Sequence, residues 1–177
     1  DDKEVLLVFS SGTGKNPPKP ILYTKKDMQA MRDGIRRFYE ISGCSGVFYN
    51  LLPFAPHMAF YFASFYGEES GSLMINTGGG KHFTTEKTVG LMHGFKPEMI
   101  AGMPSYVLKV LEAAKEKDVD LFGVKFVWGA NGINESFIEK VKGYCSGATV
   151  LATYGFTEAR CAWTTCADKD QGYHVFA

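Results

Sequence analysis

The sequence predicts an α/β fold, a mostly parallel sheet with helices on both faces. Short apolar runs of the buried-strand type alternate with longer segments of helical periodicity along the 177 residues. Turns rich in glycine, proline and hydroxyl residues separate these segments. The composition, 45% hydrophobic and 21% charged, is that of a globular protein with a sizeable core. Alternating strand and helix units of this kind build crossover connections between parallel strands.

Seven apolar runs predict strands. Each is four to eight residues long, and most are bounded by glycine, proline or asparagine. The first run, VLLVF, is expected to be a buried strand. In order, the expected strands are 5–9, 21–24, 47–52, 72–76, 98–102, 124–130 and 148–155.

Five segments between these runs predict helices. The first begins after Thr24, which comes close to a capping box with Asp27, and it ends in the segment ISGCSG. The second, MAFYFASFY, is apolar on nearly every side, so we expect a buried helix. The other three begin at a threonine cap (Thr84 or Thr85), at Pro104 as a first helical residue, and after Asn134 as a cap.

The net charge, the lengths of the apolar stretches and the cysteine content exclude several classes of protein. Lysine plus arginine and aspartate plus glutamate both count 19, so no net charge favours nucleic acid or an anionic membrane as a partner. No apolar stretch has the length of a membrane span, and DDKEVLL is not a signal peptide. The four cysteines lack the density of a disulfide scaffold. We expect a reduced, cytoplasmic protein, and a homo-oligomer is possible.

Four loops are expected to carry the chemistry. In open α/β sheets, ligands bind beyond the carboxyl ends of the strands, at a topological switch point. This rule selects residues 10–19, 53–57, 129–132 and 154–158.

The first of these loops, SSGTGKNPPKP, suits a phosphate chain. Glycines free backbone N–H groups, and small hydroxyls and mobile ammonium groups complete an anion cradle. The alternative is a polar hairpin turn without a ligand, because turns need the same residues. The candidate phosphate ligands are Ser10, Ser11, Gly12, Thr13, Gly14, Lys15 and Lys19.

The last loop, ATYGFTEA, combines four chemical functions. Tyr154 offers a ring on which an adenine can stack, Gly155 a bend, and Thr157 a hydroxyl for a phosphate oxygen. The carboxylate of Glu158 can hold Mg²⁺, which prefers oxygen ligands and keeps phosphates as further ligands. The alternative makes Tyr154 a core aromatic residue and Glu158 a solvated charge.

Three segments together resemble the AMP-forming adenylate synthetases, the superfamily of acyl- and aryl-CoA ligases, luciferases and peptide-synthetase adenylation domains. SSGTGK resembles the family's phosphate loop, GANG its turn at the adenine and acyl pocket, and YGFTE its Y-G-x-T-E signature. The segments LPFAPH, GGGKHFTTEKTVGLM and PSYVLKVLEAAKEKDVDL look most like the phenylacetate-CoA ligase branch. The phosphate loop lacks one hydroxyl residue of the family pattern and carries NPP before Lys19. Lys15 and Lys19 are therefore both candidates for the family's lysine.

This resemblance implies a two-step reaction. A carboxylic acid attacks the α-phosphorus of ATP to give an acyl-adenylate, and coenzyme A then forms a thioester. It implies phosphate binding by residues 10–19, contacts of Thr157 and Glu158 with the α-phosphate and Mg²⁺, and an adenine framed by Tyr154, Gly155 and the turn of Gly129, Ala130 and Asn131.

His57 matches a position beside the acyl carbonyl in the family, although a histidine after a proline also serves as a cap or packed residue. Phe54, Phe60 and Tyr61 are candidates for the acyl pocket, and the alternative is that they belong to the core.

The resemblance also implies that residues 1–177 are a single α/β fragment of an N-terminal adenylation domain. Both ends look cut, and the family's ribose-binding aspartate and its C-terminal domain with the adenylation lysine lie outside this segment. We therefore expect the fragment alone to be inactive. Two other functions stay open: an acyl-protein synthetase that uses a protein thiol, and a non-catalytic nucleotide-binding module.

A second candidate site is a cluster of sulfur and imidazole ligands. Cys161, Cys166 and His174 follow the YGFTE segment and would suit a structural Zn²⁺. A fourth ligand would come from Cys145 or from beyond residue 177. Buried, inert thiols are the alternative.

Overall fold

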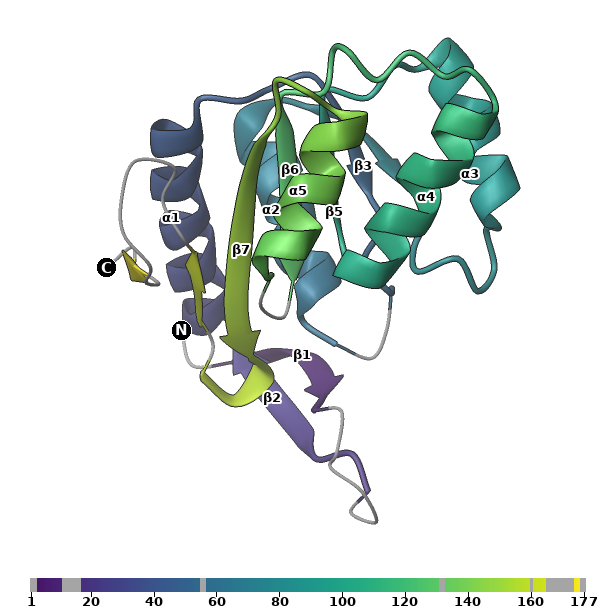
Figure 1. Ribbon diagram of the computed structural model, residues 1–177. Coiled ribbons are helices and arrows are strands. Elements are labelled where there is room, and N and C mark those ends of the chain that lie inside the picture. The colour runs from purple at the N-terminus through teal and green to yellow at the C-terminus, as the bar shows by residue number, and fades with distance from the viewer. Residues whose placement is uncertain are drawn as a thin grey trace.

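The computed structural model describes residues 3–10, 17–54, 57–130, 133–159, 161–164 and 174–175. Its centre is a sheet of strand order β4-β3-β5-β6-β7-β8-β9, and the first five of these strands run parallel (Figure 1). β8 and β9 continue the sheet in antiparallel pairing. The strands are β3 (Val47–Asn50), β4 (Leu73–Asn76), β5 (Met99–Gly102), β6 (Phe126–Ala130), β7 (Thr149–Phe156), β8 (Cys161–Thr164) and β9 (His174–Val175).

Helices cover both faces of the parallel strands, which confirms the predicted α/β fold. α1 and α2 pack on one face around Phe48 and Trp128, and α3, α4 and α5 pack on the other around Ile100 and Val127. Neighbouring residues of a strand point to opposite faces, so each central strand supplies both layers of the core. The helices are α1 (Lys25–Ser42), α2 (Ala59–Ser70), α3 (Thr85–Gly94), α4 (Pro104–Glu116) and α5 (Glu135–Tyr144).

The predicted helix starts are confirmed. Thr24 and Asp27 form a complete capping box at α1. Of the two threonines considered for α3, Thr84 is the cap. Pro104 occupies the first turn of α4, and the Asn134 side chain accepts a hydrogen bond from Phe137 N at α5. The starts of α1, α3 and α5 depend on side-chain bonds within a few residues, and that of α4 has a proline in its first turn, which is why they can be predicted locally.

The strand order contains a topological switch point between β3 and β5. From β3 the chain passes through α2 to β4 on one side, and then through α3 to β5 on the other side. At such a point the two loops that follow the adjacent strands leave in opposite directions and open a crevice. The predicted site loops should therefore converge beyond the carboxyl ends of the strands, near this switch point.

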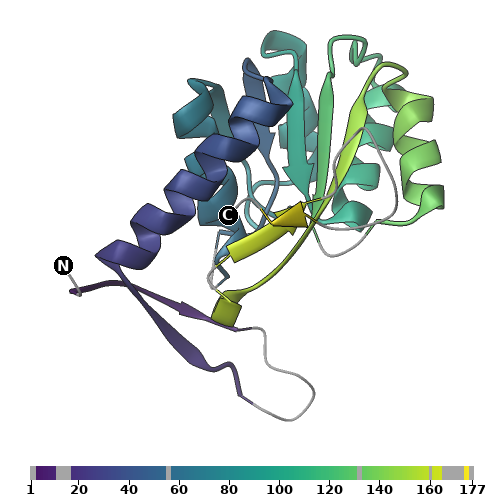
Figure 2. The same cartoon turned by 90° about the vertical axis from the view of Figure 1, so that its left-hand side faces the viewer.

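One strand prediction is wrong. The run at residues 5–9 is not a buried strand of the parallel sheet, because β1 (Glu4–Phe9) pairs with β2 (Pro20–Thr24) in a separate antiparallel hairpin. Val5 and Leu7 are 51% and 50% exposed, whereas Val8 is buried. The hairpin projects from the rest of the domain (Figure 2), so only one of its faces finds apolar partners.

The strand boundaries also differ from the prediction by one or two residues, and two of these differences lie at the predicted site loops. β3 ends at Asn50 instead of residue 52, because the buried Asn50 side chain accepts a hydrogen bond from Leu52 N and turns the chain. β7 continues through Phe156, so Tyr154 and Gly155 lie in a strand, and only Thr157–Ala159 form a short 3₁₀ turn.

Across the described part of the chain, no helix is both long and apolar enough to cross a membrane.

Candidate active site

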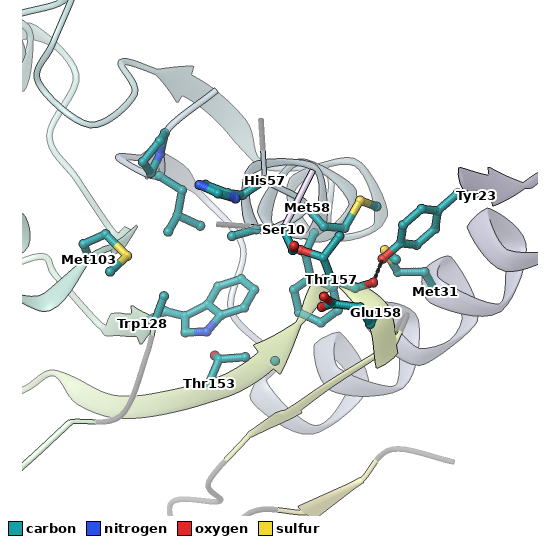
Figure 3. Close-up of a pocket in the computed structure, with 16 residues that line it drawn as sticks. Ser10, Tyr23, Met31, His57, Met58, Met103, Trp128, Thr153, Thr157 and Glu158 are labelled. Carbon is teal, nitrogen blue, oxygen red and sulfur yellow. Dashed lines mark hydrogen bonds between the residues drawn. The ribbon is translucent and has the colours of Figure 1, made fainter. Parts of the chain in front are cut away.

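A pocket of about 470 Å³ lies at the carboxyl end of the parallel strands (Figure 3). This volume lies within the usual range of small-molecule sites, about 300–1,000 Å³. Apolar side chains form most of its wall, and a few hydroxyl, imidazole and carboxylate groups join them. The lining residues are Ser10, Tyr23, Met31, Leu52, Pro53, His57, Met58, Ala59, Phe62, Met103, Trp128, Ala130, Thr153, Gly155, Thr157 and Glu158.

The pocket brings together all four loops that the sequence predicts as site loops. The loops at residues 10–19 and 129–132 contribute Ser10 and Ala130. The loop at 53–57 contributes Pro53 and His57, and the segment 154–158 contributes Gly155, Thr157 and Glu158. The remaining candidates Ser11, Gly12, Thr13, Gly14, Lys15 and Asn131 lie outside the described residues.

The hairpin closes one side of the pocket. Ser10 and Lys19 join the two ends of the predicted phosphate loop, since Ser10 N donates to Lys19 O over 3.0 Å and Lys19 N donates to Ser10 Oγ over 3.3 Å. Ser10 lines the pocket, whereas Lys19 is exposed and does not. The base of the loop therefore stands at the pocket.

His57 connects the hairpin to the start of α2. Its Nδ1 lies 3.1 Å from the carbonyl oxygen of Phe9. A carbonyl oxygen only accepts hydrogen bonds, so Nδ1 carries a proton. In the neutral ring, Nε2 is then a hydrogen-bond acceptor, and in the charged ring it is a donor. The imidazole lines the pocket directly beside the base of the predicted phosphate loop.

Thr157 and Glu158 stand where β7 ends. The 3₁₀ turn that carries them follows Phe156, and the Tyr23 hydroxyl of β2 donates a hydrogen bond to the backbone carbonyl of Thr157 (Figure 3). Thr157 is half-buried, and Glu158 is exposed. An exposed carboxylate beside a hydroxyl has the hard oxygen donors that Mg²⁺ prefers, together with room for water and phosphate as further ligands.

The sheet separates two of the predicted adenine contacts, Tyr154 and Gly129, from this pocket, whereas Ala130 and Gly155 line it. Thr153 and Gly155 line the pocket, so Tyr154, which lies between them in β7, points to the opposite face. A Cβ atom on Gly129 would meet Ile133 Cγ2 at 2.5 Å, on the side of α5. Tyr154 is 50% exposed on that side. The candidate residues at the carboxyl ends of β6 and β7 therefore form two groups, one on each face of the sheet.

Several lining residues were missed from the sequence. Trp128 is 3% exposed in β6, and it lies on the same face of the strand as Ala130. The alternation of side chains along β6 could have placed Trp128 on the face of Ala130, opposite Gly129, before the structure was known. The predicted acyl-pocket residues Phe54, Phe60 and Tyr61 do not line this pocket; their rings contact one another, and Phe60 and Tyr61 pack against the core on the side of α1 and α2. Phe62 of α2 lines the pocket instead, because a helix turns successive residues by about 100° and only some reach the sheet.

The predicted zinc site lies largely outside the described residues. Cys166 is not described, and of Cys161 and His174 only the backbone in β8 and β9 is. Cys145 is buried, and burial raises the pKa of its thiol to about 12. Within the described ranges, no three His, Cys, Asp or Glu residues are grouped as a metal site.

Comparisons with known proteins identify the fold. A family model described as AMP-binding enzyme matches residues 1–175. No curated protein sequence matches the chain. A solved structure of 2-hydroxyisobutyryl-CoA ligase in complex with 2-HIB-AMP and CoA is 16% identical with a TM-score of 0.80, over 98% of this chain and 38% of that chain.

Two further structures are similar. A long-chain-fatty-acid-CoA ligase from Archaeoglobus fulgidus is 15% identical with a TM-score of 0.67, over 88% of this chain and 32% of that chain. The luciferase-like enzyme from the nonluminescent mealworm Zophobas morio is 20% identical with a TM-score of 0.63, over 89% of this chain and 35% of that chain. The chain thus spans less than two-fifths of each of these structures, and at these identities the likeness is one of fold.

Proposed function

The chain belongs to the AMP-binding enzyme family, and from this premise we propose that the full-length protein activates a carboxylic acid with ATP and then transfers the acyl group to coenzyme A. The observation that carries the proposal is the meeting of Ser10, His57, Thr157 and Glu158 around one apolar pocket. Hydroxyl, imidazole and carboxylate groups converge there from segments far apart in the chain. Such convergent polar groups on an apolar pocket are typical of a site that orients one small molecule.

The apolar pocket is proposed to hold the hydrocarbon part of the acid. Trp128 and Phe62 present aromatic surfaces whose ring centroids are 5.5 Å apart, and Met58 and Met103 complete the wall. Methionine side chains are unbranched and adapt to irregular apolar ligands. These walls support an aromatic or compact apolar acid, in line with a phenylacetate-CoA ligase-like substrate.

The nucleotide is proposed to bind across the carboxyl ends of β6 and β7. Tyr154 offers its exposed ring to the adenine on the α5 side, with the backbone of Gly129, Ala130 and Asn131 as the other wall. The phosphate chain would then extend over the edge toward Ser10 and the loop that includes Lys15. This placement puts the acid and the α-phosphate on neighbouring sides of the Thr157–Glu158 turn.

The proposed reaction has two steps, adenylation of the acid and formation of the thioester. An oxygen of the acid's carboxylate forms a bond to the α-phosphorus of ATP, and the bond between the α-phosphorus and pyrophosphate breaks. The sulfur of coenzyme A then bonds to the acyl carbon, its thiol proton is released, and AMP leaves with the former carboxylate oxygen. The chain's own share is orientation: its residues hold the carboxylate, the phosphates and the departing groups in line.

Individual residues have separate proposed roles. The Thr157 hydroxyl would donate a hydrogen bond to an α-phosphate oxygen, and Glu158 would hold Mg²⁺. Mg²⁺ held there would supply positive charge to balance that of the phosphates. His57 lines the pocket with its Nδ1 held by Phe9 O, so its Nε2 would be the ring atom that contacts the acyl group.

Pyrophosphate exchange by the full-length protein tests this function. Radioactive pyrophosphate should enter ATP only when a suitable carboxylic acid is present, and a panel from acetate through phenylacetate to palmitate would identify the acid. AMP release with and without coenzyme A then separates a coenzyme A ligase from an acyl-protein synthetase. If none of the acids in the panel supported pyrophosphate exchange, the proposal would be contradicted.

A further inference from the structure

Tyr23 links two parts of the site that are distant in the sequence. It is fully buried in β2, and it lines the pocket. Its hydroxyl donates to the backbone carbonyl of Thr157, a residue 134 positions further along the chain (Figure 3). The hydrogen bond therefore connects the phosphate-loop hairpin with the 3₁₀ turn at the end of β7.

The accepting carbonyl belongs to the peptide group between Thr157 and Glu158. A peptide group is planar, so a bond that holds its oxygen restricts rotation of the whole plane. The two rotations that turn this plane also set the directions of the two flanking side chains. A bond to this oxygen thus acts on both the hydroxyl of Thr157 and the carboxylate of Glu158 through the backbone.

The hairpin needs such attachments because it stands out from the domain (Figure 2). A second attachment is the hydrogen bond of His57 to the carbonyl of Phe9, next to Ser10. One attachment thus lies at the end of β1 beside the loop, and the other at the end of β2. Together they place the base of the loop relative to α2 and to the turn.

We propose that Tyr23 is a positioning residue, which orients the Thr157–Glu158 peptide group and sets this turn at a fixed distance from the phosphate-loop hairpin. The inference rests on the proposed function. Reacting groups displaced by about 1 Å can lose as much as about 100-fold in rate while binding persists. Loss of the Tyr23 hydroxyl should therefore act on kcat more than on KM.

The test compares two tyrosine-to-phenylalanine variants of the full-length protein. Tyr23→Phe removes the hydroxyl and keeps the buried ring. Tyr49→Phe is the matched control, because Tyr49 is also fully buried and its hydroxyl donates to the carbonyl of Phe95 over 2.8 Å, on the opposite face of the sheet. We expect Tyr23→Phe to lower kcat of pyrophosphate exchange at least about tenfold, with KM for ATP and acid within about threefold. Tyr49→Phe should keep kcat within about twofold at a similar loss of thermal stability.

Two results would overturn the inference. One is a kcat of Tyr23→Phe within about twofold of the wild type, and the other is an equal loss of kcat in Tyr49→Phe, which would mark a general effect on stability. A second readout does not need activity: with ¹⁵N-glutamate labelling, the Glu158 amide resonance should shift in Tyr23→Phe and stay in place in Tyr49→Phe. An inactive wild-type protein would contradict the proposed function, and the Glu158 resonance would then still decide whether Tyr23 orients this peptide group.

Discussion

At the residue scale, the candidate site consists of a few polar groups that the backbone holds from several directions. The Nδ1 of His57 is committed to Phe9, which leaves Nε2 for the pocket. Asn50 is fully buried, and its amide nitrogen contacts Phe60 O at 3.3 Å while its oxygen accepts from Leu52 N. These bonds fix the loop after β3 and the start of α2, and so determine where His57 stands.

Glu158 gives the first prediction. In the full-length protein, Glu158→Gln should keep nucleotide affinity within about tenfold and lower pyrophosphate exchange by about 100-fold or more, because a metal ligand acts chiefly on charge in the transition state. Exchange is measured at saturating Mg²⁺, and nucleotide affinity by calorimetry. Glu139→Gln, an exposed position on α5, is the control and should match the wild type. Near-normal exchange in Glu158→Gln would remove Glu158 from the metal site.

The buried thiols give a pH prediction. Burial raises the pKa of Cys145 from 9.0 to about 12, so above pH 9 the unfolded chain loses a proton that the folded chain keeps. Stability should therefore be complete below pH 9 and fall as pH rises, by about 1 kcal/mol from this group at pH 10. Urea midpoints at pH 8 and pH 10 measure the loss, and Cys145→Ala should show a smaller one. Equal slopes in the two proteins would contradict the prediction.

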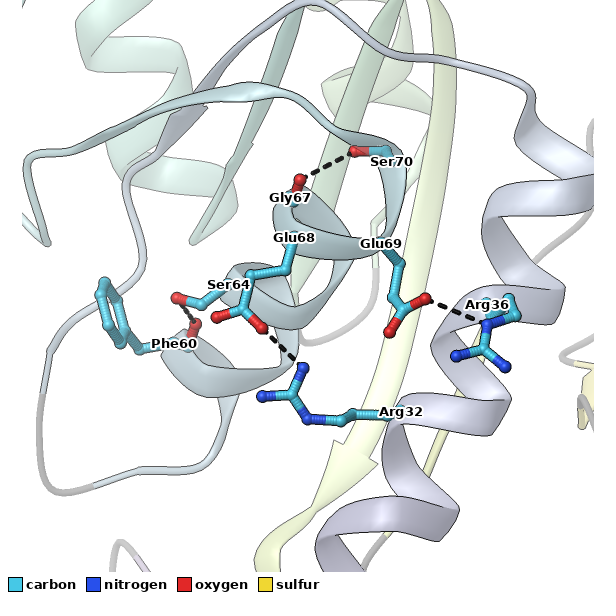
Figure 4. A network of polar contacts seen from close by, with 8 residues as sticks. All are labelled: Arg32, Arg36, Phe60, Ser64, Gly67, Glu68, Glu69 and Ser70. Atoms are coloured by element: carbon cyan, nitrogen blue, oxygen red, sulfur yellow. Dashed lines mark hydrogen bonds and ion pairs between the residues drawn. The ribbon is translucent and has the colours of Figure 1, made fainter.

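At the element scale, α1 and α2 form one connected layer over the pocket. Arg32 bonds Glu68 at 2.6 Å and Arg36 bonds Glu69 at 3.0 Å across the two helices (Figure 4). The guanidinium of Arg32 also lies 4.1 Å from the ring centroid of Phe65. Exposed ion pairs add little stability, so the apolar contacts beneath them hold the layer together. Phe38 of α1 and Tyr66 of α2 meet Trp128 there, with centroids at 5.5 and 6.0 Å.

The start of α1 gives a prediction at this scale. Thr24→Ala removes the two hydrogen bonds of the Thr24 hydroxyl, one accepted from Asp27 N and one donated to Asp27 Oδ2, and this should cost about 1 kcal/mol, or about 3 °C in melting temperature for a chain of this size. Thr84→Ala is the control, because its single capping bond to Lys87 N is longer, at 3.4 Å, and its loss should be smaller. Calorimetry on both variants decides, and an unchanged melting temperature in Thr24→Ala would contradict the assignment of the cap.

At the scale of the whole molecule, one sheet is well covered and the other is not. The parallel sheet has helices on both faces, whereas the β1–β2 hairpin has an outer face of exposed apolar side chains. Val5 and Leu7 of β1 and Leu22 of β2 are 43 to 51% exposed, and Leu7 lies directly opposite Leu22. A two-stranded sheet also leaves two strand edges, which favours pairing with other chains.

We therefore predict that the 177-residue chain self-associates through this hairpin. The double variant Leu7→Glu, Leu22→Lys should reduce association, because it removes exposed apolar surface and introduces an attractive pair of opposite charges that preserves the strand pairing. Light scattering over a concentration series measures this. Phe122→Ser, which removes a side chain that is 87% exposed before β6, should leave association unchanged. A wild-type chain that stays monomeric at all concentrations would contradict the prediction.

The sequence by itself determined the order of the helices and of the strands up to β7, the helix caps and the four loops of the site, whereas β8 and β9 were not among the expected strands. Each depends on neighbours in the chain: the period of apolar residues sets the element, and Thr24 or Asn134 satisfies N–H groups a few residues away. The rule that ligands bind at the carboxyl ends of strands then sufficed to select Ser10, His57, Thr157 and Glu158.

Only the tertiary structure decided which side of each element meets the ligand. It separated β1 from the parallel sheet, turned Tyr154 away from the pocket, and placed Trp128 and Phe62 where Phe60 and Tyr61 were expected. It also brought Tyr23 to Thr157 across 134 residues. The physical reason is that these contacts form between segments far apart in the chain, where pairing and close packing of whole elements outweigh any local pattern.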